Sequence, residues 1–262
     1  MAYQLIYKHF ILCRFAMDLD KTIDWADADT FGRHLAMAKQ AIVPTLENQT
    51  KKNFILVFLT HHDTEENTDM LKGLTDKFPV EVVNPVKEAV LTGGRIGNAE
   101  VVITSRLDYD DYIDREVVEH IQSLVKENPK AMLYGISTGC TYDMEEKQPY
   151  LFATPPYGME MHGLHAPMLS AIYNLHYVRR PFTVLDLGQH DKCIDTFDKK
   201  QGEWLRWTVD SRKIAVLDYL NEVGFLWTRH PLSFTQRDGF LHNTAIKVKI
   251  SEEDMATKFG FR

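Results

Sequence analysis

Residues 101–121 read VVITSRLDYDDYIDREVVEHI, a stretch that joins a short apolar run to a group of aspartates. The run at residues 101–107 is short and rich in β-branched side chains, which predicts a buried strand. The aspartates that follow it are Asp108, Asp110, Asp111 and Asp114. They are typical either of a solvated helix N-terminus, where exposed amides favour carboxylates, or of a metal site at the end of a strand.

Apolar strands of this kind alternate with amphipathic helices through the first half of the chain. The strands predicted in this way are residues 9–15, 53–60, 80–85, 101–107 and 131–137. The predicted helices are residues 29–49, residues 64–78 and a segment that begins at Val117. Pro44 should kink or end the first of them. This pattern predicts an α/β fold with a mainly parallel central sheet and helices on both faces.

The second half of the chain is less regular. Residues 138–167 carry four of the ten prolines, which predicts a long functional loop or hairpin above the sheet. Residues 167–178 and 211–225 are predicted as helices, and residues 182–188 as a strand. We expect the last twenty residues to be peripheral.

Composition narrows the classes of function. The 262 residues are 44% hydrophobic and 26% charged, as in a globular protein, and the net charge of −7 argues against nucleic acid as a partner. The N-terminus lacks the features of a signal peptide and no apolar run is long enough for a transmembrane segment, so we expect a cytoplasmic protein. Cys13, Cys140 and Cys193 lie far apart without a metal-binding spacing, which is typical of reduced thiols.

Five short segments occur in an order that resembles a known family. They are KHFILCRF at residues 8–15, Trp25, IVPTLENQTKKNFILVF at residues 42–58, TSRLDYDD at residues 104–111 and GEWLRW at residues 202–207. Together they resemble the rhamnosyltransferase family of GT-A-like glycosyltransferases. Tyr109 stands where that family favours Asn, and Thr45 where Ser is usual.

The resemblance implies a GT-A-like, or nucleotide-diphospho-sugar transferase, fold in which residues 1–262 form one domain. About residues 1–112 would be the nucleotide-binding half and about residues 113–262 the acceptor-binding half. The implied activity is the transfer of a sugar, rhamnose or another hexose, from a nucleotide-diphosphate donor to a glycan or other hydroxyl acceptor. It would depend on Mn²⁺ or Mg²⁺ and would invert the anomeric centre.

The aspartates are the candidate metal ligands of such an enzyme. Ligands bind outside the carboxyl ends of the strands in an open α/β sheet, and Asp108 stands at such an end. The resemblance assigns the ion mainly to Asp110, where it would offset the charge of the leaving diphosphate as a Lewis acid. Asp108 would share the ion or hold the ribose, Asp111 is the alternative ligand, and His190 is a candidate third ligand.

Other residues are candidates for binding the donor. Arg14 and Arg106, each at the edge of a predicted strand, could bind phosphate bidentately or form surface ion pairs. Asp63 follows the second strand, where such enzymes recognise the base. Arg95 is also predicted to bind the donor. We expect the three aspartates to face a cleft that also contains Arg14 and Asp63.

An inverting transfer also needs a general base beyond the metal-binding strand. Glu160, in the Pro-rich segment, is the candidate catalytic residue, with Asp143 and Asp186 in reserve; His162 and His165 are expected to line the pocket. Two alternatives stay open. A sugar nucleotidyltransferase should carry a Gly-rich loop after its first strand, whereas AMDLDKTIDW follows here, and a non-catalytic glycan-binding protein has no need of metal-ligating aspartates.

Overall fold

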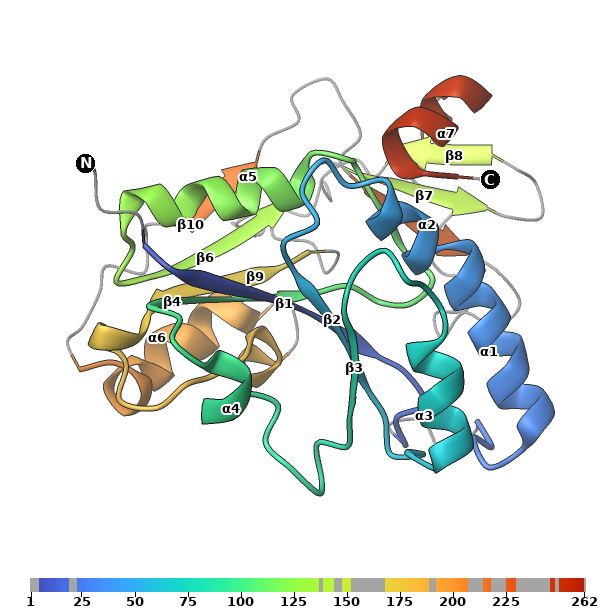
Figure 1. The fold of residues 1–262 in the computed structure, drawn as a ribbon. Helices are drawn as coiled ribbons and strands as arrows, with labels where there is room; N and C mark the ends of the chain where they lie inside the picture. The colour runs from blue at the N-terminus through green and yellow to red at the C-terminus, as the bar shows by residue number, and fades with distance from the viewer. Residues whose placement is uncertain are drawn as a thin grey trace.

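The computed structural model of the chain describes residues 5–18, 23–136, 139–143, 148–151, 168–188, 192–206, 214–217, 225–229, 246–247 and 250–261. Within these residues, no helix has the length and apolar character that a membrane crossing requires. Two β-sheets and the helices that cover them make up this part of the molecule (Figure 1).

The larger sheet contains the strands that the sequence predicts in its first half. In the described residues its strands are β1 (Tyr7–Arg14), β2 (Ile55–Leu59), β3 (Val80–Val83), β4 (Val101–Arg106), β6 (Ala131–Ile136), β9 (Ser170–Asn174) and β10 (Ile214–Leu217). Their order is β10-β6-β9-β4-β1-β2-β3. Only β9 among them runs antiparallel to its neighbours, β4 and β6, so the prediction of a mainly parallel sheet is confirmed.

Helices cover both faces of this sheet, as predicted. They are α1 (Ala28–Gln40), α2 (Ile42–Glu47), α3 (Glu65–Lys72), α4 (Gly93–Ile96), α5 (Val117–Ser123) and α6 (Cys193–Trp204), with 3-10 turns η1 (Leu124–Glu127), η2 (Leu175–Tyr177) and η3 (Val184–Leu187). Successive side chains of β1 point to opposite faces. Ile11 packs with α1, α2, α3 and α5, whereas Phe10 and Leu12 pack with α4, η3 and α6. Figure 1 shows α5 on one side of the sheet and α6 on the other.

The break that Pro44 predicts lies between α1 and α2. The first helix ends at Gln40 and the second begins at Ile42, so Pro44 lies in the first turn of a new helix. An N–H group in the first turn has no acceptor within the helix, and a proline is tolerated there.

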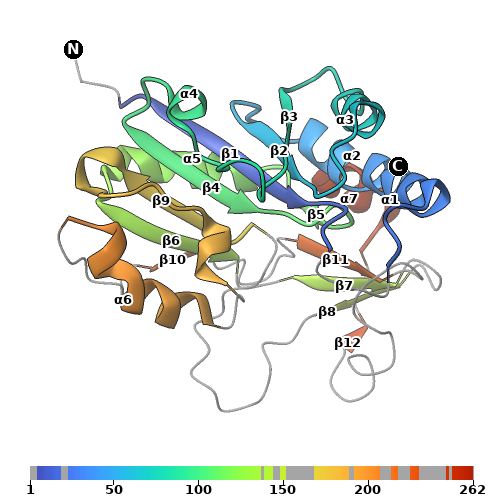
Figure 2. The same cartoon turned by 90° about the horizontal axis from the view of Figure 1, so that it is seen from below.

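A smaller sheet adjoins the carboxyl edge of β4. In the described residues it contains β5 (Tyr112–Ile113), β7 (Cys140–Asp143), β8 (Gln148–Leu151), β11 (Phe225–Arg229) and β12 (Ile246–Lys247) in the order β12-β8-β7-β11-β5 (Figure 2). The antiparallel pair β7 and β8 confirms a hairpin within residues 138–167. Helix α7 (Glu252–Phe259) buries Met255 and Phe259 against Tyr112 and Leu226, so the chain end is not peripheral.

Three predictions for the second half are wrong. Residues 170–174 form β9 and not a helix, because this short apolar run is buried between two strands, and such a run does not distinguish helix from strand by its period. Residues 184–187 form η3 and not a strand, because the Asp186 carboxylate accepts the Thr183 N–H at 2.6 Å and caps a turn. The helix predicted at residues 211–225 is replaced by β10, paired with β6, and by the start of β11.

Candidate functional site

Four parallel strands end at one edge of the larger sheet and deliver polar side chains there. Strand β1 ends at Arg14, β2 at Leu59, β3 at Val83 and β4 at Arg106. Because these strands are parallel, their carboxyl ends meet at the same edge. The polar residues that end these strands or follow them are Arg14, Asp18, His61, His62, Asp63, Asn84, Lys87, Arg106 and Asp108. The predicted placement of Asp108 at this edge is confirmed.

Two arginines converge on the carboxylate of Asp108. Nη2 of Arg106 donates to Oδ2 of Asp108 at 2.8 Å, and Nε of Arg106 lies 3.5 Å from Oδ1. Nη2 of Arg14 lies 3.4 Å from both oxygens of the same carboxylate. Burial of the Asp108 carboxyl acts to raise its pKa, but the charges of Arg106 and Arg14 outweigh burial, so the pKa lies below its usual value. Asp108 is therefore held in its ionised form.

Arg14 is the less satisfied of the two arginines. Its contacts with Asp108 are at the long end of hydrogen-bond distances. Its Nε atom is buried and has no hydrogen-bond acceptor in the described part of the chain. Buried donors are normally paired in proteins. The Arg14 side chain as a whole is 34% exposed, so the part of the guanidinium that faces solvent can contact an anion.

The other aspartates of the group differ in their surroundings. Asp110 is half-buried, and its backbone carbonyl accepts a hydrogen bond from the hydroxyl of Thr228 in β11. Asp111 is only 2% exposed. Asp114 is buried, and its Oδ1 accepts the N–H of Glu116 at 2.9 Å, which closes a turn just before α5, so this side chain is not solvated.

Tyr109, between the first two aspartates, packs against the inner side of α1. Its hydroxyl lies 2.6 Å from Nδ1 of His34, and its ring contacts Phe15 edge-on with the centroids 5.4 Å apart. Burial raises the pKa of the Tyr109 hydroxyl far above its usual value. The aromatic residue at this position thus anchors the aspartate segment to the core, which an Asn could not do to the same extent.

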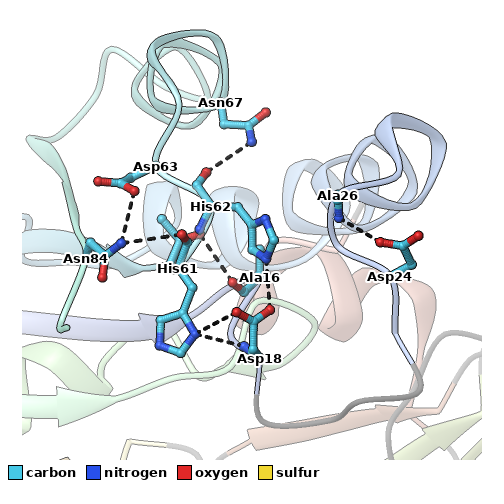
Figure 3. Close-up of polar contacts among 10 residues, drawn as sticks. Ala16, Asp18, Asp24, Ala26, His61, His62, Asp63, Asn67 and Asn84 are labelled. Atoms are coloured by element: carbon cyan, nitrogen blue, oxygen red, sulfur yellow. Dashed lines mark hydrogen bonds and ion pairs between the residues drawn. The ribbon is translucent and has the colours of Figure 1, made fainter. Parts of the chain in front are cut away.

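A second polar cluster joins the loops after β1 and β2 (Figure 3). Nε2 of His62 lies 2.8 Å from Oδ1 of Asp18. Nδ1 of His61 lies 3.1 Å from both the backbone nitrogen and Oδ2 of Asp18. A neutral Nδ1 can accept from the amide, and a protonated one can donate to the carboxylate. The hydrogen bond from His62 is the main reason why the pKa of Asp18 lies below its usual value.

The backbone at this junction is unusual for a residue other than glycine. Ala16 has φ +48°, in the left-handed region, and its carbonyl accepts the N–H of His61 at 3.1 Å. Such conformations are costly and cluster at functional sites. The left-handed conformation of Ala16 turns the chain after β1, so that Asp18 lies beside the loop after β2.

Asp63 lies in the same region and has two partners. Its Oδ1 accepts from Nδ2 of Asn84 at 3.0 Å and from Nζ of Lys87 at 2.7 Å (Figure 3 shows the contact with Asn84). The hydrogen bond from Lys87 is the largest cause of a lowered pKa for Asp63, followed by that from Asn84. Asp18, Asn84 and Lys87 were not predicted as site residues; the signal that could have found them is that Asp18 and Lys87 follow predicted strands and Asn84 is near the end of one.

Arg95 does not lie with this group. It belongs to α4, and its backbone carbonyl accepts from Lys8 near the start of β1, at the amino edge of the sheet. Its guanidinium donates to Glu81 at 2.7 Å and to Glu88 at 3.0 Å. Arg95 thus ties down the chain between β3 and α4, and this placement does not support its predicted role in donor binding.

Several predicted site residues lie outside the described residues. They are Glu160, His162, His165 and His190. The segment that carries Glu160 rejoins the described chain at Met168, whose N–H donates to the carbonyl of Arg106 at 2.7 Å. Asp186, a reserve for the general base, lies within η3, where its carboxylate accepts the N–H of the cap residue Thr183. Within the described residues, no three His, Cys, Asp or Glu side chains are grouped to hold a metal ion.

Comparisons with known proteins found only distant structural similarity. No family model and no curated protein matches the chain. Similar solved structures include residues 1–349 of S. aureus TarS in complex with UDP-GlcNAc, with 12% identity and a TM-score of 0.44, over 85% of this chain and 59% of that chain. HddC from Yersinia pseudotuberculosis is similar at 14% identity and TM-score 0.36, over 81% of this chain and 90% of that one. Mouse xyloside xylosyltransferase 1 is similar at 16% identity and TM-score 0.37, over 81% and 86%.

Proposed function

We propose that this chain is a glycosyltransferase that takes a sugar from a nucleotide-diphosphate donor and transfers it to a hydroxyl acceptor, such as that of a glycan. The observation that carries the proposal is the convergence of Arg14 and Arg106 at the carboxyl edge of the parallel strands. The three side chains of Arg14, Arg106 and Asp108 together carry one net positive charge. A diphosphate is a multidentate anion that matches such a site.

The same edge offers a place for the nucleoside. Asp63 accepts hydrogen bonds and Lys87 donates them, and the two side chains are in contact. A carboxylate beside an ammonium group suits the edge of a base that carries an N–H next to a carbonyl. This supports the role in base recognition that the sequence predicts for Asp63.

The acidic side chains suit a metal ion that is bound jointly by protein and donor phosphates. They suit an ion bound by protein ligands alone less well. Asp108 is engaged by two arginines and Asp111 is buried, which leaves Asp110 as the carboxylate suited to the ion. Mg²⁺ and Mn²⁺ often bind through one or two carboxylates, with substrate phosphates and waters as the other ligands. When bound there, such an ion would stabilise the negative charge that develops on the leaving diphosphate.

The chain's own residues would perform the remaining steps. Arg14 and Arg106 would hold the diphosphate, so that the bond between the anomeric carbon and the diphosphate oxygen lies at the sheet edge. The acceptor oxygen would attack the anomeric carbon from the opposite side as that bond breaks, and a carboxylate would take the acceptor's proton. Glu160, which the sequence predicts for this role, is our candidate for the base.

A thermal-shift panel tests the proposal. The protein is heated with nucleotide sugars that differ in base and sugar, with and without Mn²⁺, because a ligand that binds only the folded state raises the melting temperature. We expect one nucleotide to give a shift that Mn²⁺ increases, and the matching sugar to be transferred to an acceptor. Stabilisation by a nucleoside triphosphate, with pyrophosphate release from a sugar phosphate, would show a nucleotidyltransferase instead. A shift with glycans alone would show a binding protein.

A further inference from the structure

The carboxylate of Asp108 is already engaged on both oxygens. Arg106 approaches Oδ2 at 2.8 Å and Oδ1 at 3.5 Å, and Arg14 lies 3.4 Å from each. A divalent cation at this carboxylate would stand next to two guanidinium charges, which repel it. It would also have to displace donors that are charged and hence strong. In this environment the Asp108 carboxylate is suited to be the counterion of the two arginines and is not suited to bind a metal ion.

The two arginines are held by the sheet itself. The N–H of Arg106 donates to the carbonyl of Leu169 at 2.9 Å and its carbonyl accepts from Met168 at 2.7 Å, and its side chain is 13% exposed. Arg14 is the last residue of β1 and pairs with Leu59. Both guanidinium groups therefore extend from fixed backbone, and only their side chains need to be oriented.

Asp108 supplies that orientation. Two guanidinium groups repel each other, so without an anion between them they would move apart. Arg14 still has a buried Nε without an acceptor among the described residues, which shows that Asp108 does not satisfy it fully. The Arg14 side chain is 34% exposed, so a ligand with more oxygens than a carboxylate, such as a diphosphate, could bind the accessible part of its guanidinium.

We propose that Asp108 is a positioning residue that holds Arg14 and Arg106 together as a diphosphate-binding clamp, and that this clamp binds the anion without a metal ion. The inference rests on the proposed function, since it concerns the same donor. Preorganised binding groups raise affinity because less freedom is lost on binding. The clamp and the ion would then be separate contributions, the first from Asp108 and the arginines and the second from Asp110.

Calorimetric titration separates the two contributions. The probes are inorganic pyrophosphate and the nucleoside diphosphates UDP, dTDP, GDP, CDP and ADP, each in EDTA and in Mn²⁺. In EDTA, we expect Arg14→Gln and Arg106→Gln to weaken pyrophosphate binding at least tenfold and Asp108→Asn at least fivefold, with partial recovery in Asp108→Glu. The gain in affinity that Mn²⁺ gives should stay within twofold of wild type in Asp108→Asn, and it should disappear in Asp110→Asn.

Two control variants are titrated in the same way. Asp195→Asn on α6 and Arg179→Gln, both exposed positions, should bind as wild type does. The inference is overturned if Asp108→Asn loses the Mn²⁺ gain as Asp110→Asn does, or if it binds pyrophosphate more tightly in EDTA. Failure of the proposed function looks different, because the wild type would then bind no probe under either condition. Melting temperatures of all variants show whether each is folded.

Discussion

Arg106 Nη2 lies 2.8 Å from Asp108 Oδ2. Only one residue, the fully buried Leu107, separates the two in the sequence. Side chains two residues apart on an extended chain point the same way, so the order Arg-Leu-Asp places the pair at the edge and the leucine in the core. Leu12 is paired with Arg106 in the parallel register, so Arg14 arrives beside Asp108. The candidate site thus follows from strand pairing and alternation.

Tyr109 tests how the aspartate segment is anchored. Tyr109→Phe removes the contact with His34 and should lower the free energy of unfolding by roughly 0.5–1.5 kcal/mol, the usual net value of one hydrogen bond. Tyr109→Asn also removes the ring that packs on Phe15 and should cost about 3 kcal/mol or more. Urea unfolding measures both. If the Asn variant were as stable as the Phe variant, the ring would not anchor the segment.

His9 should make the fold sensitive to acid. It is buried, its Nε2 lies 2.7 Å from the hydroxyl of Ser105, and burial lowers its pKa to about 3. Between about pH 6.5 and pH 3, the unfolded chain binds a proton that the folded chain does not, so stability falls as the pH is lowered through this range. From pH 7.5 to pH 5, this histidine should lower the free energy of unfolding by about 2 kcal/mol.

The measurement for His9 is denaturant unfolding at these two pH values. His9→Gln should reduce the difference between them by about the same amount, whereas the exposed control His176→Gln should leave it unchanged. An unchanged difference in His9→Gln would mean that other groups cause the acid sensitivity.

Asp63 separates base recognition from phosphate binding. Its carboxylate accepts from Lys87 and Asn84 and lies at the loop after β2. Asp63→Asn should lower the affinity for a nucleoside diphosphate about tenfold, which corresponds to about 1.4 kcal/mol. It should leave the affinity for pyrophosphate unchanged. Asp69→Asn, exposed on α3, is the matched control. Equal losses for both probes would place Asp63 at the phosphates.

Gly260 tests the attachment of the C-terminal helix. It has φ +70°, and a Cβ atom there would lie 2.6 Å from the carbonyl oxygen of Pro44. Gly260→Ala should therefore destabilise the fold by at least about 1 kcal/mol. Gly202→Ala in α6, where a Cβ would have no close neighbour, should stabilise it by roughly 0.5–1 kcal/mol. Thermal unfolding measures both effects: the melting temperature should fall in Gly260→Ala and rise in Gly202→Ala.

The sequence predicted the first half of the fold well because its strands are continuous apolar runs separated by clear helical periods. It failed at residues 170–174, where a strand that is buried on both faces shows no period that excludes a helix. The residue types at the edge were also predictable, but their partners were not. The contacts of Asp18 with His61 and His62 depend on the left-handed turn at Ala16, which no residue pattern indicates. Arg95 was predicted to bind the donor, but its helix α4 lies near the opposite edge of the sheet, where its carbonyl accepts from Lys8.

Asp110 is the carboxylate on which the proposed metal-dependent transfer depends. Asp110→Asn preserves the shape of the side chain and removes its charge, so the fold should persist while the leaving diphosphate loses the stabilisation that an ion supplies. The matched control is Asp195→Asn, the same change at an exposed position of α6. The measurement is sugar transfer from the donor that the thermal-shift panel identifies, with Mn²⁺ present. We expect a loss of at least about a hundredfold in Asp110→Asn, or about 2.7 kcal/mol, and wild-type transfer in Asp195→Asn. Equal transfer by the two variants would contradict the proposal.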